Sequence, residues 1–197
     1  MAVDRQTPYQ MQALSPAPYP LVTGVEVDHV SLLQRPDLLK THEQTLNMVT
    51  GELSTQMSFN PGKEISLELE VLQFAYRSVP ALLCQEIRIT PSSNVRASIT
   101  TQIGIKGVPG TVYRYRPPEQ TEIDLVMGFR SHRELSERGA AAAVLPQPGI
   151  QRTGEPLSTN DGVTREYHLD GKGGRTYRFQ TIAAMVSHRR IGYADRS

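Results

Sequence analysis

A strict alternation of apolar and polar residues between Glu64 and Val71 constrains this chain more than any other feature of its sequence. Successive side chains of a β-strand point to opposite faces of a sheet, so such a pattern buries one face and leaves the other in water. A turn sequence, Asn60-Pro61-Gly62-Lys63, directly precedes it. The segment therefore predicts a half-buried strand of an antiparallel sheet. Its apolar positions are Ile65, Leu67, Leu69 and Val71, and its polar positions are Glu64, Ser66, Glu68 and Glu70.

Strand-like segments recur along the chain at residues 21–28, 46–53, 82–90, 95–103, 121–129, 163–169 and 177–188. Turn sequences separate them, among them Pro91-Ser92-Ser93-Asn94 and Asn160-Asp161-Gly162. Within 46–53, Gly51 predicts a turn between two strands, because glycine readily takes a positive φ. Many short strands with turns between them are typical of two packed sheets. We predict an all-β domain with at most one or two short helices.

Four segments depart from this pattern. Residues 1–20 contain four prolines, which break regular structure and predict an extended, Pro-rich arm ahead of a single β-sandwich domain over residues 21–197. Residues 131–144 end in an alanine-rich run, and alanine's high helix propensity predicts a short helix there. Residues 146–162 are predicted to form mostly loop, and residues 37–44 fit a short helix or a loop equally well.

Composition narrows the classes of protein that this chain can belong to. It has 197 residues with a net charge of +1, which gives no long-range attraction to nucleic acid or to an anionic membrane. No segment approaches the roughly 20 apolar residues of a membrane span. The N-terminus lacks the apolar core of a secretory signal, and Cys84 is the only cysteine, so we expect a cytoplasmic location. Tryptophan is absent, which leaves tyrosine as the main aromatic residue for stacking on a sugar.

No residue pattern indicates a complete catalytic or metal site. The five histidines lack the short spacing of zinc ligands, so we predict no metal, no cofactor and no catalytic residue in this chain. The glutamates of the 64–71 strand are predicted to lie on a solvated face. An enzymatic alternative remains, in which a histidine and a carboxylate converge in a groove. The candidates for that pair are His132 or His168 with Glu122 or Glu166.

Three segments of the chain resemble the N-terminal domain of glycoside hydrolase family 65. The first is the stretch from Glu43 to Leu53, which is similar to the family's Leu-Asp-Met/Leu-x-x-Gly-x-Leu motif, although Asn47 replaces the usual aspartate. Residues 67–78 resemble a family strand that ends in an aromatic-x-x-x-Ser pattern, and residues 81–103 resemble a pair of strands with their connecting turn. The resemblance covers residues 21–105, and beyond them Tyr177 to His188 fits a late strand of the family.

This resemblance implies an antiparallel β-supersandwich of the galactose-mutarotase type. The family includes maltose, trehalose and kojibiose phosphorylases and acid trehalases, in which this domain packs on an (α/α)6 barrel that holds the catalytic acid. The resemblance therefore implies a non-catalytic accessory domain whose partner is a catalytic barrel, as a domain or a subunit, absent from these residues. It also leaves room for an oligosaccharide ligand and for a homodimer.

A free-standing carbohydrate-binding module is the alternative interpretation. Such a module requires an exposed aromatic platform, because the apolar face of a sugar stacks on aromatic rings. We predict Tyr76, Tyr113 and Tyr115 as the residues that would form it. Neither nucleic acid nor a membrane is expected as a partner.

Overall fold

The computed structural model describes residues 2–5, 12–15, 17–62, 64–114, 122–131, 136–145 and 147–187. Almost all regular structure in them is antiparallel β-strand, arranged in sheets of eight, five and two strands. A single 3₁₀ turn, η1 (Pro36–Leu38), is the one helical element of the described residues. The all-β fold class predicted from the sequence is confirmed.

The larger sheet contains eight strands, and each is antiparallel to its neighbours. In sheet order they are β10 (Gly110–Arg114), β11 (Leu125–Ser131), β12 (Glu137–Leu145), β15 (Tyr177–Ser187), β8 (Leu82–Pro91), β7 (Leu67–Ala75), β6 (Glu52–Phe59) and β5 (Leu39–Asn47).

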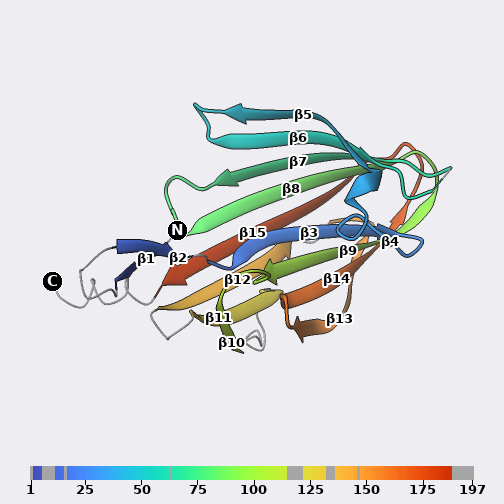
Figure 1. The fold of residues 1–197 in the computed structure, drawn as a ribbon. Coiled ribbons are helices and arrows are strands. Elements are labelled where there is room, and N and C mark those ends of the chain that lie inside the picture. Colours follow the sequence, from blue (N-terminus) through green and yellow to red (C-terminus); the bar gives the residue numbers. More distant parts are fainter. Residues whose placement is uncertain are drawn as a thin grey trace.

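The second sheet contains five strands and lies over the middle of the first. Its order is β13 (Ile150–Thr159), β14 (Gly162–Gly171), β9 (Val95–Gly104), β3 (Tyr19–Val27) and β4 (Val30–Ser31). Strand β3 packs against β8, β12 and β15, whereas β9 and β14 pack against β11. Figure 1 shows β5, β6 and β7 continuing the large sheet beyond the edge of the smaller one. The result is a sandwich whose larger sheet is only partly covered.

The core lies between the two sheets in two clusters of buried apolar side chains. The first surrounds Phe59, Ile89 and Phe179, and the second surrounds Met127 and Phe129. Ring centroids of Tyr167 and Phe179 lie 5.1 Å apart in an edge-to-face arrangement, so aromatic contact joins the two sheets within the first cluster.

A row of polar side chains separates these clusters. Thr23, Thr101 and Arg165 are cross-strand partners on the inner face of the small sheet, and Gln85 and Thr181 are partners on the inner face of the large one. The Thr23 hydroxyl donates a hydrogen bond of 2.6 Å to Gln85 Oε1 across the interior. We refer to these five residues as the interior polar layer.

The alanine-rich segment does not form the helix that its composition predicted. Residues Ala140 to Ala143 lie in the middle of β12, hydrogen-bonded between β11 and β15. Ala140 and Ala142 are buried in the core, whereas Ala141 and Ala143 point to the other face. Alternating burial of small residues is what a central strand needs, and sheet pairing on both sides outweighs a propensity difference of less than about 1 kcal/mol per residue.

Other sequence predictions met mixed outcomes. The strand predicted at 65–71 begins at Leu67 as β7, and the strands predicted at 82–90 and 95–103 are β8 and β9. The loop predicted over 146–162 is wrong in part, because β13 occupies most of it as an edge strand. The undecided 37–44 segment is η1 followed by β5.

Within the predicted arm, β1 (Ala2–Arg5) and β2 (Gln12–Ser15) pair with each other as the two-stranded sheet. Strand β3 begins at Tyr19 and includes Pro20.

Candidate functional site

The outer face of the eight-stranded sheet, which points away from the smaller sheet, carries a polar half and an apolar half. Cross-strand partners share a face of a sheet. Because Ile89 and Phe179 are buried inward, the alternating positions Arg88, Arg178 and Gln180 point outward. The same rule places Glu70 beside Arg88 on this outer face.

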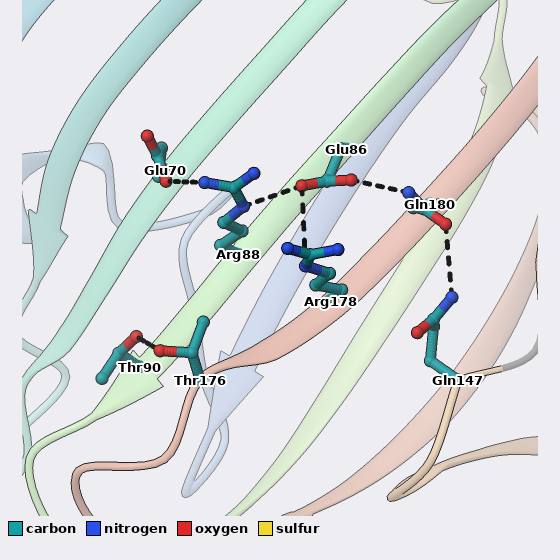
Figure 2. A network of polar contacts seen from close by, with 8 residues as sticks. All are labelled: Glu70, Glu86, Arg88, Thr90, Gln147, Thr176, Arg178 and Gln180. Carbon is teal, nitrogen blue, oxygen red and sulfur yellow. Dashed lines mark hydrogen bonds and ion pairs between the residues drawn. The ribbon is translucent and has the colours of Figure 1, made fainter.

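In the polar half, a chain of hydrogen bonds and ion pairs crosses three strands (Figure 2). The Arg88 guanidinium donates from Nη1 to Glu70 Oε2 at 2.9 Å and from Nε to Glu86 Oε1 at 2.7 Å. The other Glu86 oxygen accepts from the Gln180 amide at 2.6 Å, and Gln180 Oε1 accepts from Gln147 at 3.2 Å. Arg178 Nε lies 3.9 Å from Glu86 Oε1. Figure 2 shows Glu86 at the centre of this network.

Electrostatics in the network favour the ionised forms. Partial burial alone would raise the pKa of Glu86, but the hydrogen bonds from Gln180 and Arg88, with the positive charges of Arg88 and Arg178, hold it below its usual value. Hydrogen bonds to Glu86 and Glu70 raise the pKa of Arg88. A carboxylate in this state accepts hydrogen bonds and does not supply a proton near neutral pH.

A hollow of about 780 Å³ lies beside the network on the same face. Its volume falls within the roughly 300–1,000 Å³ of small-molecule sites. Arg175 borders it with its guanidinium carbon 5.4 Å from the centroid of the Tyr177 ring. The other polar residues at its wall include Glu70, Arg88, Thr90, Gln147, Thr176 and Arg178. This wall presents hydrogen-bond donors and acceptors from four strands and two loops.

The apolar half of the outer face occupies the other ends of the same strands. The register aligns Phe74, Cys84, Ile182 and Ala143 in one row. A second row consists of Leu82, Ala184, Ala141 and Val126, and Val186 lies beyond it with 52% of its surface exposed. All these side chains are at least partly exposed. Partial burial raises the pKa of the Cys84 thiol, which favours the neutral form.

A tip of exposed apolar residues continues the apolar half. Met48 and Val49 occupy the turn between β5 and β6, and Tyr76 and Val79 occupy the turn between β7 and β8. An Arg77 guanidinium nitrogen donates to the carbonyl of Val49, which ties the two turns together. Met48 and Val49 are 80% and 79% exposed.

A buried carboxylate lies inside the sandwich, away from the outer face. The side chain of Asp124 is fully buried, with Arg152 Nε 2.7 Å and Arg165 Nη1 3.6 Å from Oδ1. Its second oxygen accepts the backbone N–H of Val144 at 2.6 Å. Burial and the charge of Asp124 raise the pKa of Tyr167 well above its ordinary value, so its phenol stays neutral. This cluster fastens β11, β12, β13 and β14 to one another.

The structure places Tyr76 and Tyr113, two of the three tyrosines that the sequence predicted as a sugar-stacking platform, far apart. Tyr76 lies after β7 with 48% of its surface exposed, and Tyr113 lies in β10 with 52% exposed. Four strands separate β7 from β10, a distance of about 24 Å at the usual strand spacing. The Tyr113 ring lies 5.4 Å from the Arg130 guanidinium carbon. Tyr115 lies outside the described residues.

The histidine and carboxylate candidates are also dispersed. His132 lies outside the described residues. His168 contacts Asp170 at 3.2 Å and Glu166 contacts Ser98, all on the outer face of the small sheet. Glu122 is exposed and lines a partly open pocket of about 280 Å³ together with Arg152 and Tyr167. Within the described ranges there is no group of three or more histidine, cysteine or acidic residues able to hold a metal.

The residues of the polar network escaped prediction because the sequence does not reveal which strands pair. The polar positions Glu86 and Arg88 alternate with buried isoleucines, and Arg178 and Gln180 alternate with buried aromatics. That signal identifies one outward face on each strand. Only the pairing of β8 with β15, which lie far apart in the sequence, places the two polar sets side by side.

Comparison with a family model gives a match over nearly the whole chain. Residues 4–196 match the model described as Glycosyl hydrolase family 65, N-terminal domain. The search of curated proteins found no match.

Two solved structures align with most of this chain. A structure described as a kojibiose phosphorylase from human microbiome aligns with a TM-score of 0.67 and 9% identity, over 88% of this chain and 24% of its own. A heparinase III structure aligns with a TM-score of 0.49 and 9% identity, over 82% of this chain and 23% of its own. At these identities the first likeness shows the fold alone, and this chain spans about a quarter of that protein's length.

None of the helices in the part of the chain that is described has the length and apolar character needed to cross a membrane.

Proposed function

This chain belongs to the family of glycosyl hydrolase family 65 N-terminal domains, and from that premise we propose that it is a non-catalytic accessory domain of a carbohydrate-active enzyme. Its partner is a catalytic domain, fused to it or separate, that phosphorolyses or hydrolyses a disaccharide. The role of the domain is to support that partner by packing against it. A cytoplasmic location and a homodimer remain predictions alongside this proposal.

The apolar half of the outer sheet face is the observation that carries the proposal. An outward sheet face in water normally presents polar residues, and contiguous apolar patches mark contact surfaces. Here two rows of apolar side chains each cross four strands, and together span five, without a charge among them. Alanines and Gly139 in β12 let another element approach the sheet closely. A large domain with an apolar surface of its own fits such a face.

The state of the carboxylates supports a non-catalytic role. Cleavage of a glycosidic bond needs a proton donor, which is a carboxylic acid with a raised pKa. Glu86 is instead held ionised by arginine and glutamine, and Asp124 is enclosed by two arginines inside the sandwich. Both carboxylates hold strands together.

Val186→Asp tests the packing of the domain on its partner. Val186 is half exposed in the apolar half, so aspartate there leaves the fold intact but opposes contact with an apolar surface. In the enzyme that contains both parts, we expect weaker association or a lower melting temperature of the catalytic domain. Co-elution and calorimetry measure these effects.

Leu157→Asp is the matched control. Leu157 is 66% exposed on β13, at the edge of the small sheet, and its replacement leaves the association unchanged. If both variants changed the association or the melting temperature equally, the proposed contact surface would be contradicted. The proposed role would be contradicted if this chain had no catalytic domain of the family as a partner, either fused or separate.

A free-standing carbohydrate-binding module is the second candidate function, and the polar hollow favours it. The tyrosine platform that we predicted for it divides into separate positions, Tyr76 and Tyr113, each of which could stack on one sugar ring. Calorimetric titration with an oligosaccharide tests this role, since Tyr113→Ala weakens the binding if that ring contacts the sugar.

A further inference from the structure

We infer that the hollow on the polar half of the outer sheet face is a binding site for a short, neutral oligosaccharide, which it holds through the sugar hydroxyls. This inference rests on the second candidate function above, for which it names the site and the ligand class, and it is independent of the proposed accessory role. The hollow lies on the same sheet as the apolar half but on the opposite ends of β7, β8 and β15.

The first argument is that several polar groups of the wall are already fixed in position. Glu86 accepts hydrogen bonds from both Arg88 and Gln180. Arg88 also donates to Glu70, and Gln180 accepts from Gln147. Each residue projects from a sheet strand or a loop beside it, and each is held by a neighbour. A ligand that binds such a wall does not have to order the side chains first, which lowers the entropic cost of binding.

The second argument is that the wall has hydrogen-bonding capacity beyond its internal contacts. A guanidinium has five N–H donors, and the contacts of Arg88 to the two glutamates use only its Nε and Nη1 atoms. Arg178 is 57% exposed and reaches Glu86 only through Nε at 3.9 Å. Thr90 and Thr176 share one hydrogen bond of 2.8 Å, which leaves one hydroxyl hydrogen for another acceptor. Sugar hydroxyls both donate and accept, so they match this mixed wall.

The third argument is charge balance. Three arginines, Arg88, Arg175 and Arg178, face the hollow, and Glu68 and Glu70 line it with Glu86 directly behind. The charges cancel, so a phosphate or another anion gains no net attraction here. A neutral ligand rich in hydroxyls does not need such attraction.

Calorimetric titration of the whole protein with maltotriose and with cellotriose tests this inference, with sodium sulfate as the anion probe. We expect at least one trisaccharide to bind and sulfate neither to bind nor to compete. Arg178→Ala should weaken the binding about tenfold or more, because it removes hydrogen bonds from a charged donor. Arg178→Lys should weaken it as well, since lysine keeps the charge but lacks the planar fork.

Arg96→Ala is the matched control. Arg96 lies on β9 of the other sheet, is exposed, and forms an ion pair of 3.8 Å with Asp170 that resembles the Arg178–Glu86 pair. Its loss should leave sugar affinity unchanged, and circular dichroism should show both alanine variants folded.

Three results would overturn the inference. The first is no binding of either sugar, and the second is equal affinity in Arg178→Ala and the unaltered protein. The third is displacement of the sugar by sulfate. If Arg178→Ala weakens association with a catalytic domain while no sugar binds, the hollow belongs to the domain contact. Sugar binding that persists in Val186→Asp separates this site from the accessory role.

Discussion

Asp124 is a charged residue whose side chain is fully buried. Taking a carboxylate out of water is costly, and here the cost is offset by Arg152, Arg165 and the backbone N–H of Val144. Arg165 also donates to the carbonyl of Gly154, which anchors the irregular part of β13. Through these contacts, the Asp124 side chain fixes the positions of strands from both sheets.

Asp124→Asn should therefore destabilise the protein by about 3 kcal/mol, because it leaves the buried Arg165 without an opposite charge. For a domain of this size the melting temperature should fall by about 6–12 °C. Urea unfolding followed by circular dichroism measures the change. Asp170→Asn, at an exposed ion pair, is the control and should change stability by less than about 1 kcal/mol. Equal effects of both changes would contradict the anchoring role of Asp124.

Glu86 should make stability depend on acid pH. Its pKa is lower in the folded protein than in the unfolded chain, where it is about 4.3, so its contribution is present above that pH. The contribution is lost as the pH falls through the folded-state pKa.

We expect Glu86→Gln to cost about 1–2 kcal/mol at neutral pH, and this difference from the unaltered protein should shrink below about pH 4. Urea unfolding at several pH values measures it. Parallel stability curves for the two proteins would refute the prediction.

At the scale of the elements, β12 shows where sequence patterns mislead. Its run of small residues resembles a helix in composition, and the sequence does not reveal which face is buried where every residue from Gly139 to Ala143 is small. By contrast, the 65–71 segment was predictable because large apolar residues alternate there with glutamates. A strand can be predicted where its two faces differ in polarity, whereas the helix or strand propensity of its residues is a weaker guide.

The turn between β13 and β14 depends on one glycine. Gly162 has a φ of 134°, and a Cβ at this position would overlap the carbonyl oxygen of Ile103 on the paired strand β9. Gly162→Ala should cost at least about 2–3 kcal/mol, since the strand would have to move away. Gly51→Ala is the control, because Gly51 has a φ of 75° but free space around it, and it should cost about 1–2 kcal/mol. Thermal unfolding ranks the two, and the opposite order would show that the contact with Ile103 is dispensable.

For the molecule as a whole, the fold class and most strands could be predicted, whereas the candidate site could not. Local alternation gives most strands and their two faces. The site needs the order of the strands, and β15 pairs with β8 across nearly half of the sequence. Arg178 and Glu86 therefore look like ordinary surface charges until the sheet is assembled. The tyrosines were selected for their ring chemistry, and strand order then separated Tyr76 from Tyr113.

The interior polar layer has a consequence for how the two sheets find their alignment. A shift of one sheet by two residues along its strands keeps every inward side chain pointing inward. Apolar contacts alone would therefore not distinguish the shifted alignment from the native one. Such a slip would set Thr23 against Ile87 or Leu83 instead of Gln85 and leave the glutamine amide without a hydrogen-bond partner among apolar side chains. The interior polar layer therefore specifies how the two sheets align. The native alignment has a lower free energy than alignments shifted by two residues.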